Sequence, residues 1–352
     1  VELTIFVVFE EGNLKYRGSA STKIHVSSTD DEIKDIIKDL EFSSRFVKNE
    51  YYPLVDKHDK VFGEVKSDLD GKDLFQSLEE LDKAFYSKDD FEKGYTSYGE
   101  FFVSEFENRI INSLGLDISF KTYGVDIETS VIWKDQKEIE IYESYKMSNC
   151  NTKMLSDNIE KLFWISSEKV NAVGLPKIDS DYNILLSGEC LKELFKYYYE
   201  NSAAQNVYPK LSTFEVGNSI QGNEILGDKI SLELNPFLEG STESRAFDAD
   251  GFPLDKNMII ENGKLIKYWG DLRFSSYLNI NPTGDMKNYI ISGGTFSEDE
   301  LRQNKYIEFL SFSDFQMNSI TGDFGSEVRL GFLFDGKKKI SVTGGSISGN
   351  IK

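Results

Sequence analysis

The sequence predicts an α+β fold with two domains, an N-terminal sheet with flanking helices and a C-terminal, mainly antiparallel β domain. The chain has 352 residues, which is enough to bury about two hydrophobic cores. Helical periodicity is concentrated in the first half and strand-like runs in the second, as is typical of α+β proteins. Asn262-Gly263 and Asp335-Gly336 each lie between apolar runs, which predicts antiparallel hairpins with two-residue turns.

The N-terminal region predicts a β-hairpin followed by a helix. Val1 to Phe9 and Leu14 to Ala20 are strand-like runs, and the Gly-Asn pair between them provides turn chemistry. Thr29 and Glu32 form a capping box, and the apolar residues that follow recur at helical spacing. Tyr51 to Lys93 is charged and weakly patterned, with a short amphipathic piece around Leu74 to Phe85, and insertions are expected in this region.

Three further segments complete the first half. Ser97 to Leu114 predicts a helix that ends at Gly115, with the inward side chains Phe101, Phe102, Phe106 and Ile110. From Asp117 to Tyr145, apolar and polar residues alternate in the three short runs ISFKT, TSVIW and IEIYES, which predicts an antiparallel meander. Met154 to Val170 predicts another helix.

The sequence Gly-Leu-Pro at 174–176 indicates a domain boundary, with domains at 1–173 and 174–352. The chain begins without methionine inside a predicted strand, so the natural protein is expected to have residues before Val1. The second domain opens with a strand at Asn183 to Leu186 and a helix at Glu189 to Glu200. Its other strands are expected at Ile230 to Leu234, Asn257 to Ile260, Lys264 to Trp269, Ile307 to Phe312, Val328 to Phe334 and Lys339 to Val342.

Composition narrows the possible partners and location. The net charge of −20 repels phosphate and anionic lipid, so neither nucleic acid nor a membrane surface is an expected partner. No run reaches the roughly 18 apolar residues of a membrane span. Two cysteines cannot form a disulfide framework and fit a reducing compartment, so the cytoplasm is the expected location.

Residue chemistry alone shows no catalytic constellation. His25 and His58, the two histidines, lie in different segments without a cysteine nearby, so structural or solvated roles are expected for both. Cys190 follows Glu189 at a predicted helix start, where the helix dipole favours a thiolate. Because no base is close to it in the sequence, a buried apolar role is favoured over a reactive thiol.

Acidic and glycine-rich segments also favour structural interpretations. A calcium loop is faintly indicated by Asp68, Asp70, Asp73 and Glu79. Asp73, however, stands where the EF-hand pattern requires glycine. A turn between strands is expected at Asp248, Asp250 and Gly251. The segments Ser292 to Gly294 and Thr343 to Gly349 lack the Lys-Ser/Thr ending of a phosphate loop, so tight turns are expected there.

Several segments of the second half form a recognisable pattern. Ser244 to Asp271 combines an Asp-Gly turn, an apolar strand and a hairpin with its returning strand, and SSYL and NPTG follow at 275–278 and 281–284. The last segment, Met317 to Lys352, contains TGD, GF and GN at fixed places. Together with Arg17 to Ser21, these segments resemble the TldD/PmbA (TldE) family. The matching positions in the last segment are Thr321, Gly322, Asp323, Gly331, Phe332, Gly336, Gly349 and Asn350.

The resemblance implies a two-domain α+β protein that dimerises. The family includes a TldD type, a zinc metallopeptidase with an HExxxH helix, and a PmbA or TldE type without that motif. Its active pair is understood to degrade unfolded or extended peptides, which add as a strand. The family is also linked with peptide antibiotic maturation and with modulation of DNA gyrase.

The family's zinc helix falls on the segment Gly188-Glu189-Cys190-Leu191-Lys192-Glu193. Of the motif, only Glu189 survives, and Gly188 and Glu193 stand where the two histidines would be. A catalytic zinc needs about three protein ligands and an open position. No catalytic or metal-ligating residue is therefore expected in this chain, and zinc is expected only in a TldD-type partner.

The resemblance thus implies a PmbA/TldE-like subunit, catalytically silent on its own, that acts on extended peptides with a TldD-type catalytic subunit or as a self-dimer. The alternative is a stand-alone homodimer that binds or scaffolds peptides without enzymatic activity. A third and weaker hypothesis is an enzyme of other chemistry that uses carboxylates or Cys190.

Overall fold

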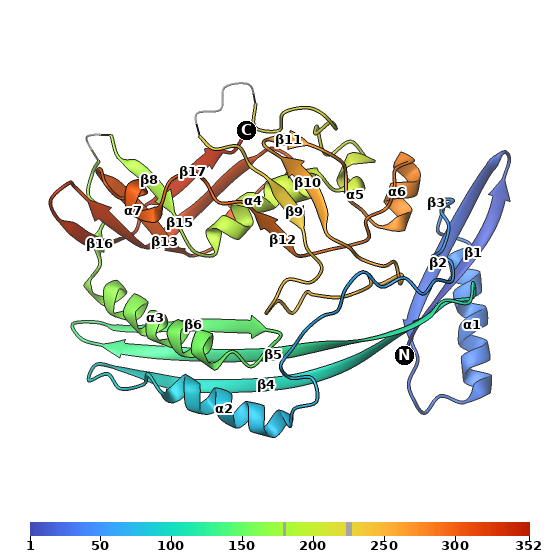
Figure 1. Ribbon diagram of the computed structural model, residues 1–352, viewed down its shortest axis with the longest axis horizontal. Helices are drawn as coiled ribbons and strands as arrows, with labels where there is room; N and C mark the ends of the chain where they lie inside the picture. Colours follow the sequence, from blue (N-terminus) through green and yellow to red (C-terminus); the bar gives the residue numbers. More distant parts are fainter. Residues whose placement is uncertain (179–180, 223–226) are drawn as a thin grey trace.

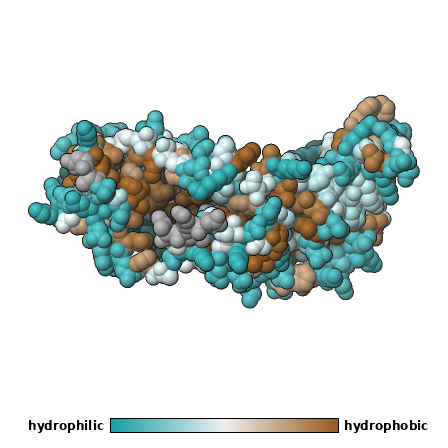
Figure 2. All heavy atoms as spheres, turned by 90° about the horizontal axis from the view of Figure 1, so that it is seen from above, coloured by the Kyte–Doolittle hydropathy of each residue, from teal (hydrophilic) through white to brown (hydrophobic). Residues whose placement is uncertain are grey.

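The computed structural model describes residues 1–178, 181–222 and 227–352, and it confirms the α+β class. A hairpin with one helix lies at one end of the molecule, a long sheet lies below, and the C-terminal part lies above that sheet (Figure 1). Seen from above, apolar side chains gather in a band framed by hydrophilic ones (Figure 2). In the described ranges, no helix is long and apolar enough to cross a membrane.

The N-terminal hairpin is confirmed. Its elements are β1 (Glu2–Glu11), β2 (Leu14–Lys23), β3 (Asn49–Glu50) and helix α1 (Asp30–Ser44). Gly12 turns the hairpin at φ +63°, a conformation that glycine adopts without strain. The capping box is also confirmed, because the Glu32 N–H donates to the Thr29 hydroxyl and the Thr29 N–H donates to the Glu32 carboxylate. The end of α1 packs directly on the backbone of Gly18.

The central part is a three-stranded antiparallel sheet with two helices on one face. Its elements are β4 (Gly94–Ile111), β5 (Asp117–Lys134), β6 (Glu138–Met147), α2 (Leu74–Tyr86) and α3 (Thr152–Asn171). Helix α3 lies where the sequence predicts one, whereas α2 forms on the short amphipathic segment for which no helix was predicted. Their core contains Phe85 and Phe163 from the helices and Val125 and Ile127 from β5, all fully buried.

The predicted helix from Ser97 to Leu114 is wrong, because this segment is strand β4. Phe101 packs inward, with its ring centroid 5.0 Å from that of Phe85. Phe102 and Phe106 lie on the other face and are 54% and 57% exposed. The aromatic residues that suggested one helical face are thus divided between two sheet faces, and pairing with β5 along the whole strand decides the structure.

The predicted meander is also longer than its pattern suggested. The runs ISFKT and TSVIW belong to one continuous strand of 18 residues, β5, and only IEIYES forms a strand of its own. Gly124 and Asp126 interrupt the alternation between the two runs. Both nevertheless keep strand pairing, with Ser104 and Phe102 of β4 respectively.

The C-terminal part contains two sheets. The seven-stranded sheet consists of β7 (Val173–Gly174), β8 (Asn183–Leu186), β13 (Tyr306–Phe312), β14 (Gln316–Met317), β15 (Asp323–Phe334), β16 (Lys339–Thr343) and β17 (Ser346–Asn350). The four-stranded sheet consists of β9 (Leu232–Leu234), β10 (Asn257–Glu261), β11 (Lys264–Leu265) and β12 (Tyr289–Ile291). The helices are α4 (Cys190–Asn201), α5 (Ala204–Val207), α6 (Leu272–Leu278) and α7 (Glu298–Leu301). Pairing is mainly antiparallel, with parallel pairs between β8 and β13 and between β7 and β16.

The two predicted hairpins differ in outcome. Asn262 and Gly263 form a two-residue turn with positive φ at both positions, +48° and +76°, as predicted. The loop at Asp335-Gly336 has four residues, because Phe334 pairs with Lys339. The carboxylate of Asp335 accepts the N–H groups of Lys337 and Lys338, and these two bonds stabilise the longer loop.

The central and C-terminal parts contact each other at both ends of the sheet. At one end, Trp164 of α3 packs against Phe332 of β15, with ring centroids 5.6 Å apart. At the other end, Phe120 of β5 packs against Phe247, with ring centroids 5.7 Å apart. The predicted boundary between residues 173 and 174 falls inside β7, which pairs with the C-terminal sheet; the boundary itself stays a prediction.

The buried ion pair between Arg302 and Glu308 gives a stability prediction. Two guanidinium N–H groups donate to Glu308, at 2.9 and 2.7 Å, and they lower the pKa of this 5% exposed carboxyl. Glu308→Gln should lower the free energy of unfolding by about 2–3 kcal/mol in urea titrations at pH 7. Because its pKa is lowered, this stabilisation is present above the ordinary value of 4.5 and is lost as pH falls.

The control is Glu298→Gln, which removes the other carboxylate that binds Arg302. Glu298 is largely exposed, so this change should alter the unfolding free energy by no more than about 0.5 kcal/mol. Equal effects of the two substitutions would contradict the assignment.

Asp248 gives a second prediction, on pH dependence. Burial raises its pKa from 3.8 to about 6, although its carboxylate accepts the N–H groups of Asp250, Phe252 and Asp285. The Asp248 carboxyl therefore binds its proton more tightly in the folded state than in the unfolded state. The resulting contribution to the free energy of unfolding is lost as pH rises from about 4 to 6. Asp248→Asn should remove up to about 2–3 kcal/mol of this pH dependence, measured by thermal unfolding between pH 4 and 7. Parallel pH profiles of the two proteins would refute the prediction.

Candidate functional site

An open groove of about 670 Å³ lies between helix α4 and the segment 314–320. The helix contributes Glu193, Glu200 and Asn201 to the lining, and Asn206 and Leu211 lie beyond its end. The groove segment, as we call residues 314–320, contributes the rest of the lining: Asp314, Phe315, Gln316, Met317, Asn318, Ser319 and Ile320. The lining is therefore mixed, with carboxylates on both walls and apolar side chains between them.

Contacts at the end of α4 tie the groove segment to the helix. Asn201 is buried, and its amide donates to the carbonyl oxygens of Tyr197 at 2.9 Å and Ser319 at 2.7 Å. The Ser319 hydroxyl donates to the carboxylate of Glu200. Lys196 lies 3.7 Å from Glu193 and 3.6 Å from Glu200, so one cation is shared by two acidic side chains. These contacts fix the width of the groove.

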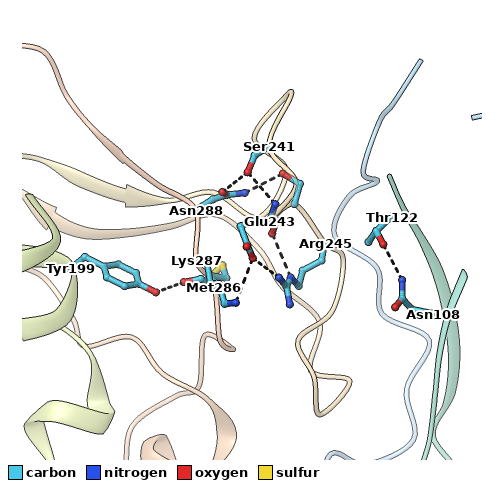
Figure 3. A network of polar contacts seen from close by, with 10 residues as sticks. Asn108, Thr122, Tyr199, Ser241, Glu243, Arg245, Met286, Lys287 and Asn288 are labelled. Atoms are coloured by element: carbon cyan, nitrogen blue, oxygen red, sulfur yellow. Dashed lines mark hydrogen bonds and ion pairs between the residues drawn. The ribbon is translucent and has the colours of Figure 1, made fainter. Parts of the chain in front are cut away.

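A different face of α4 anchors the helix to the four-stranded sheet. The Tyr199 hydroxyl donates to the Met286 carbonyl at 2.7 Å, and its ring stacks on those of Trp269 and Tyr289. Figure 3 shows this bond beside a polar network in which Arg245 donates to Glu243 at 2.6 Å. The helix that carries the acidic wall is thus held rigidly.

Strand β14 presents an open edge to the groove. Gln316 pairs with Gly325 and Met317 with Phe324, both on β15. Within the described ranges, β14 pairs with no strand other than β15, so its second edge has no strand partner. Such an edge can add an extended peptide as a further strand.

Four of the predicted family positions of the last segment adjoin the groove segment and bond to one another or to it. The side chain of Asn350 donates to Asp323 at 2.7 Å and to the Thr321 carbonyl at 3.0 Å. The Asn318 side chain accepts the Thr321 N–H at 3.0 Å, and the Gly322 N–H donates to the Asn318 carbonyl at 2.8 Å. Thr321, Gly322, Asp323 and Asn350 therefore form a clasp that shapes the groove segment.

The glycine positions of the pattern are sites of close packing. A Cβ on Gly331 would lie 2.8 Å from the Glu308 carbonyl oxygen, and one on Gly349 would lie 2.7 Å from the Phe324 ring. Gly322 has φ +83°, which favours glycine. Close approach of neighbouring atoms at Gly331 and Gly349 and a positive φ at Gly322 thus account for these glycines.

The three degenerate zinc-helix positions have different surroundings. Gly188 has φ +80° in the turn before α4, and Glu189 is the N-terminal flanking residue, without a side-chain capping bond. Only Glu193 lines the groove. A catalytic zinc requires about three side-chain ligands at one centre, and these positions do not provide such a set. Among residues 1–178, 181–222 and 227–352, no cluster of three metal-ligating side chains is found.

The other chemical candidates have structural surroundings. Cys190 is 3% exposed, its thiol donates to the Ser187 carbonyl at 3.4 Å, and burial raises its pKa to about 11. The buried role predicted for it is confirmed. His25 contacts the Ser27 hydroxyl, and the Nε2 atom of His58 lies 2.9 Å from the Gly251 carbonyl, in a contact between the first and second halves of the chain.

The acidic residues that resembled a calcium loop stabilise local structure. The Asp68 carboxylate accepts the Cys150 N–H at 2.8 Å, and Asp73 caps α2 by accepting the Phe75 N–H at 2.9 Å. The turn predicted at Asp248, Asp250 and Gly251 is confirmed, with φ +86° at the glycine.

Two family models match the chain. The model of the PmbA/TldA metallopeptidase central domain matches residues 64–157, and that of the PmbA/TldA metallopeptidase C-terminal domain matches residues 179–352. The chain belongs to the PmbA/TldD family. The matched regions contain the central sheet in one case, and α4 with the groove segment in the other.

Two curated relatives of this PmbA/TldD chain are similar over part of their length. Uncharacterized protein MJ0231 of Methanocaldococcus jannaschii is 25% identical over 258 residues, which are 69% of this chain and 59% of that protein. The metalloprotease PmbA homolog of Buchnera aphidicola is 24% identical over 250 residues, 68% of this chain and 54% of that protein. The chain thus spans somewhat more than half the length of these relatives.

Solved structures of family members share the fold. TldE from Thermococcus kodakarensis superposes with a TM-score of 0.74 at 16% identity, covering 96% of this chain and 80% of that chain. TM0727 from Thermotoga maritima, described as a proposed modulator of DNA gyrase, superposes with a TM-score of 0.75 at 17% identity, covering 99% of this chain and 86% of that chain.

Sequence reasoning missed the residues that build the groove of this family member. Asn201, Asp314 and Ser319 carry no recognisable motif of their own. The one usable signal was position, because the groove segment directly precedes the Thr321-Gly322-Asp323 pattern. The motif residues bond to one another and to Asn318, so they hold the adjoining groove segment in one conformation.

The clasp gives a prediction for local stability. Asn350→Ala removes both side-chain bonds to residues 321 and 323, so the groove segment should open more often. Amide hydrogen exchange in residues 316–322 should accelerate about thirtyfold, because the two lost bonds together contribute about 2 kcal/mol. Asn171→Ala removes one exposed side-chain bond on α3 and serves as the control. Unchanged exchange in Asn350→Ala would rule out a clasp.

Proposed function

We propose that this chain is a PmbA/TldE-type subunit that presents an extended peptide to a TldD-type metallopeptidase and holds no catalytic zinc itself. The observation that carries the proposal is the open edge of β14 along the groove beside Glu193. Main-chain pairing at a strand edge binds peptides of many sequences. This suits a subunit that assists the breakdown of unfolded polypeptides.

The residues at the degenerate zinc-helix positions support the division of labour. Gly188 has no donor side chain, and Glu189 lies outside the groove lining. Zinc-bound hydroxide is the nucleophile that a metallopeptidase generates. In the proposed pair, the partner would supply this zinc, and the present chain would supply Glu193, Glu200 and the β14 edge as one wall of the peptide path.

Other parts of the proposal rest on family membership and composition. Dimerisation with a TldD-type chain or with a second copy follows from the family. A cytoplasmic location is supported by the two free cysteines. The burial of Cys190 gives no support to a thiol nucleophile, since a low pKa and access to substrate are required for one.

The decisive experiment compares the chain alone with the chain plus an HExxxH-containing relative from the same genome. We expect substoichiometric zinc in this chain by metal analysis, and cleavage of a denatured protein substrate only in the mixture. Stoichiometric zinc together with cleavage by this chain alone would refute the proposal. A stable self-dimer that binds peptide but ignores the relative in pull-down would favour a stand-alone peptide-binding scaffold.

A substitution in the groove tests the peptide path. Leu211 lines the groove and is 45% exposed, so Leu211→Trp should fill space there without disturbing the core. Cleavage by the mixture should fall roughly tenfold in kcat/KM, since a small displacement of the peptide raises the barrier by about 1.4 kcal/mol. Leu301→Trp, at an equally exposed position on α7, is the control. Equal rates in the two variants would show that peptide does not use the groove.

A further inference from the structure

Helices α2 and α3 cover one face of the central sheet, whereas the opposite face is covered only in part. Val125 and Ile127 of β5 point into the core beneath α2 and α3. The residues that alternate with them point to the opposite face. At one end of β5, this second face is covered, because Phe120 packs against Phe247 and Ile118 approaches Gly251. Towards the other end, large side chains on the same face are exposed.

These exposed side chains form one continuous surface, which we call the open face. Strand register places its members in neighbouring rows across β4, β5 and β6. It consists of Tyr98, Glu100, Phe102, Glu128, Glu140 and Tyr142. The three aromatic residues are 39%, 54% and 55% exposed in chain order, and contiguous exposed apolar surface of this kind marks interaction sites.

The open face is also acidic. Glu100 lies directly opposite Glu128 in the β4–β5 pair, and like charges in that relation destabilise a sheet. Ser130 of β5 pairs with Tyr98 of β4 on one side and with Tyr142 of β6 on the other. The Ser130 hydroxyl donates to Glu140 at 2.7 Å. In the described part of the chain, no lysine or arginine forms an ion pair with Glu100, Glu128 or Glu140.

Two cations lie near the open face, and each is paired with another carboxylate. Lys146 is 3.7 Å from Asp126, in the row beside Glu128. Lys134 is 3.2 Å from Glu138, in the row beside Glu140. Partial burial and then the carboxylates of Glu128, Glu100 and Glu140 raise the pKa of Tyr98, which places all three charges close to this ring. The surface therefore combines unpaired negative charge with aromatic rings.

We propose that the open face binds an extended polypeptide segment rich in lysine and arginine. Cationic head groups would pair with the free carboxylates and lie over the rings of Tyr98 and Tyr142, as cations do on aromatic faces. The aliphatic stems of the same side chains would pack on Phe102, which removes its exposed ring from water. This inference does not depend on the proposed role in peptide cleavage.

Charge complementarity selects this partner over the alternatives. A second copy docked face to face would place Glu100 and Glu128 against the same carboxylates, and juxtaposed like charges oppose association. Nucleic acid would be repelled by this face and by the net charge of −20. A basic polypeptide meets neither obstacle.

The test measures fluorescence anisotropy of labelled peptides with the full chain. The probes are an extended peptide of alternating lysine and glycine and a matched peptide of alternating glutamate and glycine. The first variant is Glu100→Gln with Glu128→Gln. Its control is Glu92→Gln with Glu261→Gln, which changes the net charge equally at two exposed positions elsewhere. A further variant, Phe102→Ser, removes the apolar platform outside the core.

The lysine peptide should bind, and the glutamate peptide should not. The first double variant should weaken binding about tenfold, its control less than about twofold, and Phe102→Ser about threefold. The melting temperature of the first double variant should be unchanged or raised, because a repulsive cross-strand pair is removed.

Three outcomes would overturn the proposal. The first is absence of binding by the lysine peptide. The second is an equal loss of affinity in both double variants, which would show attraction by net charge alone. The third is self-association that Phe102→Ser abolishes while lysine-peptide affinity is unchanged, since that result would identify a second copy as the occupant.

Discussion

The pairing of strand β15 is the interaction on which the C-terminal part depends. One half of this strand pairs with β13 and β16, and the other half pairs with β14 and β17. The first half forms the core of the sheet and carries Phe332, which packs on α3 of the central part. The second half holds β14 in place and thereby sets one wall of the groove. A single backbone register thus couples the core to the candidate site.

Local sequence signals were sufficient to predict caps and turns, whose hydrogen bonds join residues that are close in the sequence. The capping box at Thr29 and Glu32 and the turn at Asn262 and Gly263 need only a few residues, and both were predicted correctly. Strand β4 could not be recognised in this way. Its partner β5 lies across a turn, and its aromatic residues imitate a helical face until that pairing is known.

The groove was beyond prediction for the same reason. Asn201 and Ser319 are 118 positions apart, yet one hydrogen bond between them fixes the distance between helix and groove segment. The family pattern indicated Thr321, Gly322 and Asp323. The structure shows that they bond to Asn318 and Asn350 next to the groove segment without lining the groove. Sequence resemblance therefore located the scaffold, whereas the lining of the site follows from long-range packing.

Both free cysteines are buried, Cys150 against the central core and Cys190 at the start of α4. A thiol reagent reaches them only when the surrounding structure opens. Each sulfur is therefore an intrinsic probe of a different region. The rates at which the two thiols are modified would report whether the central sheet and helix α4 open locally together or independently.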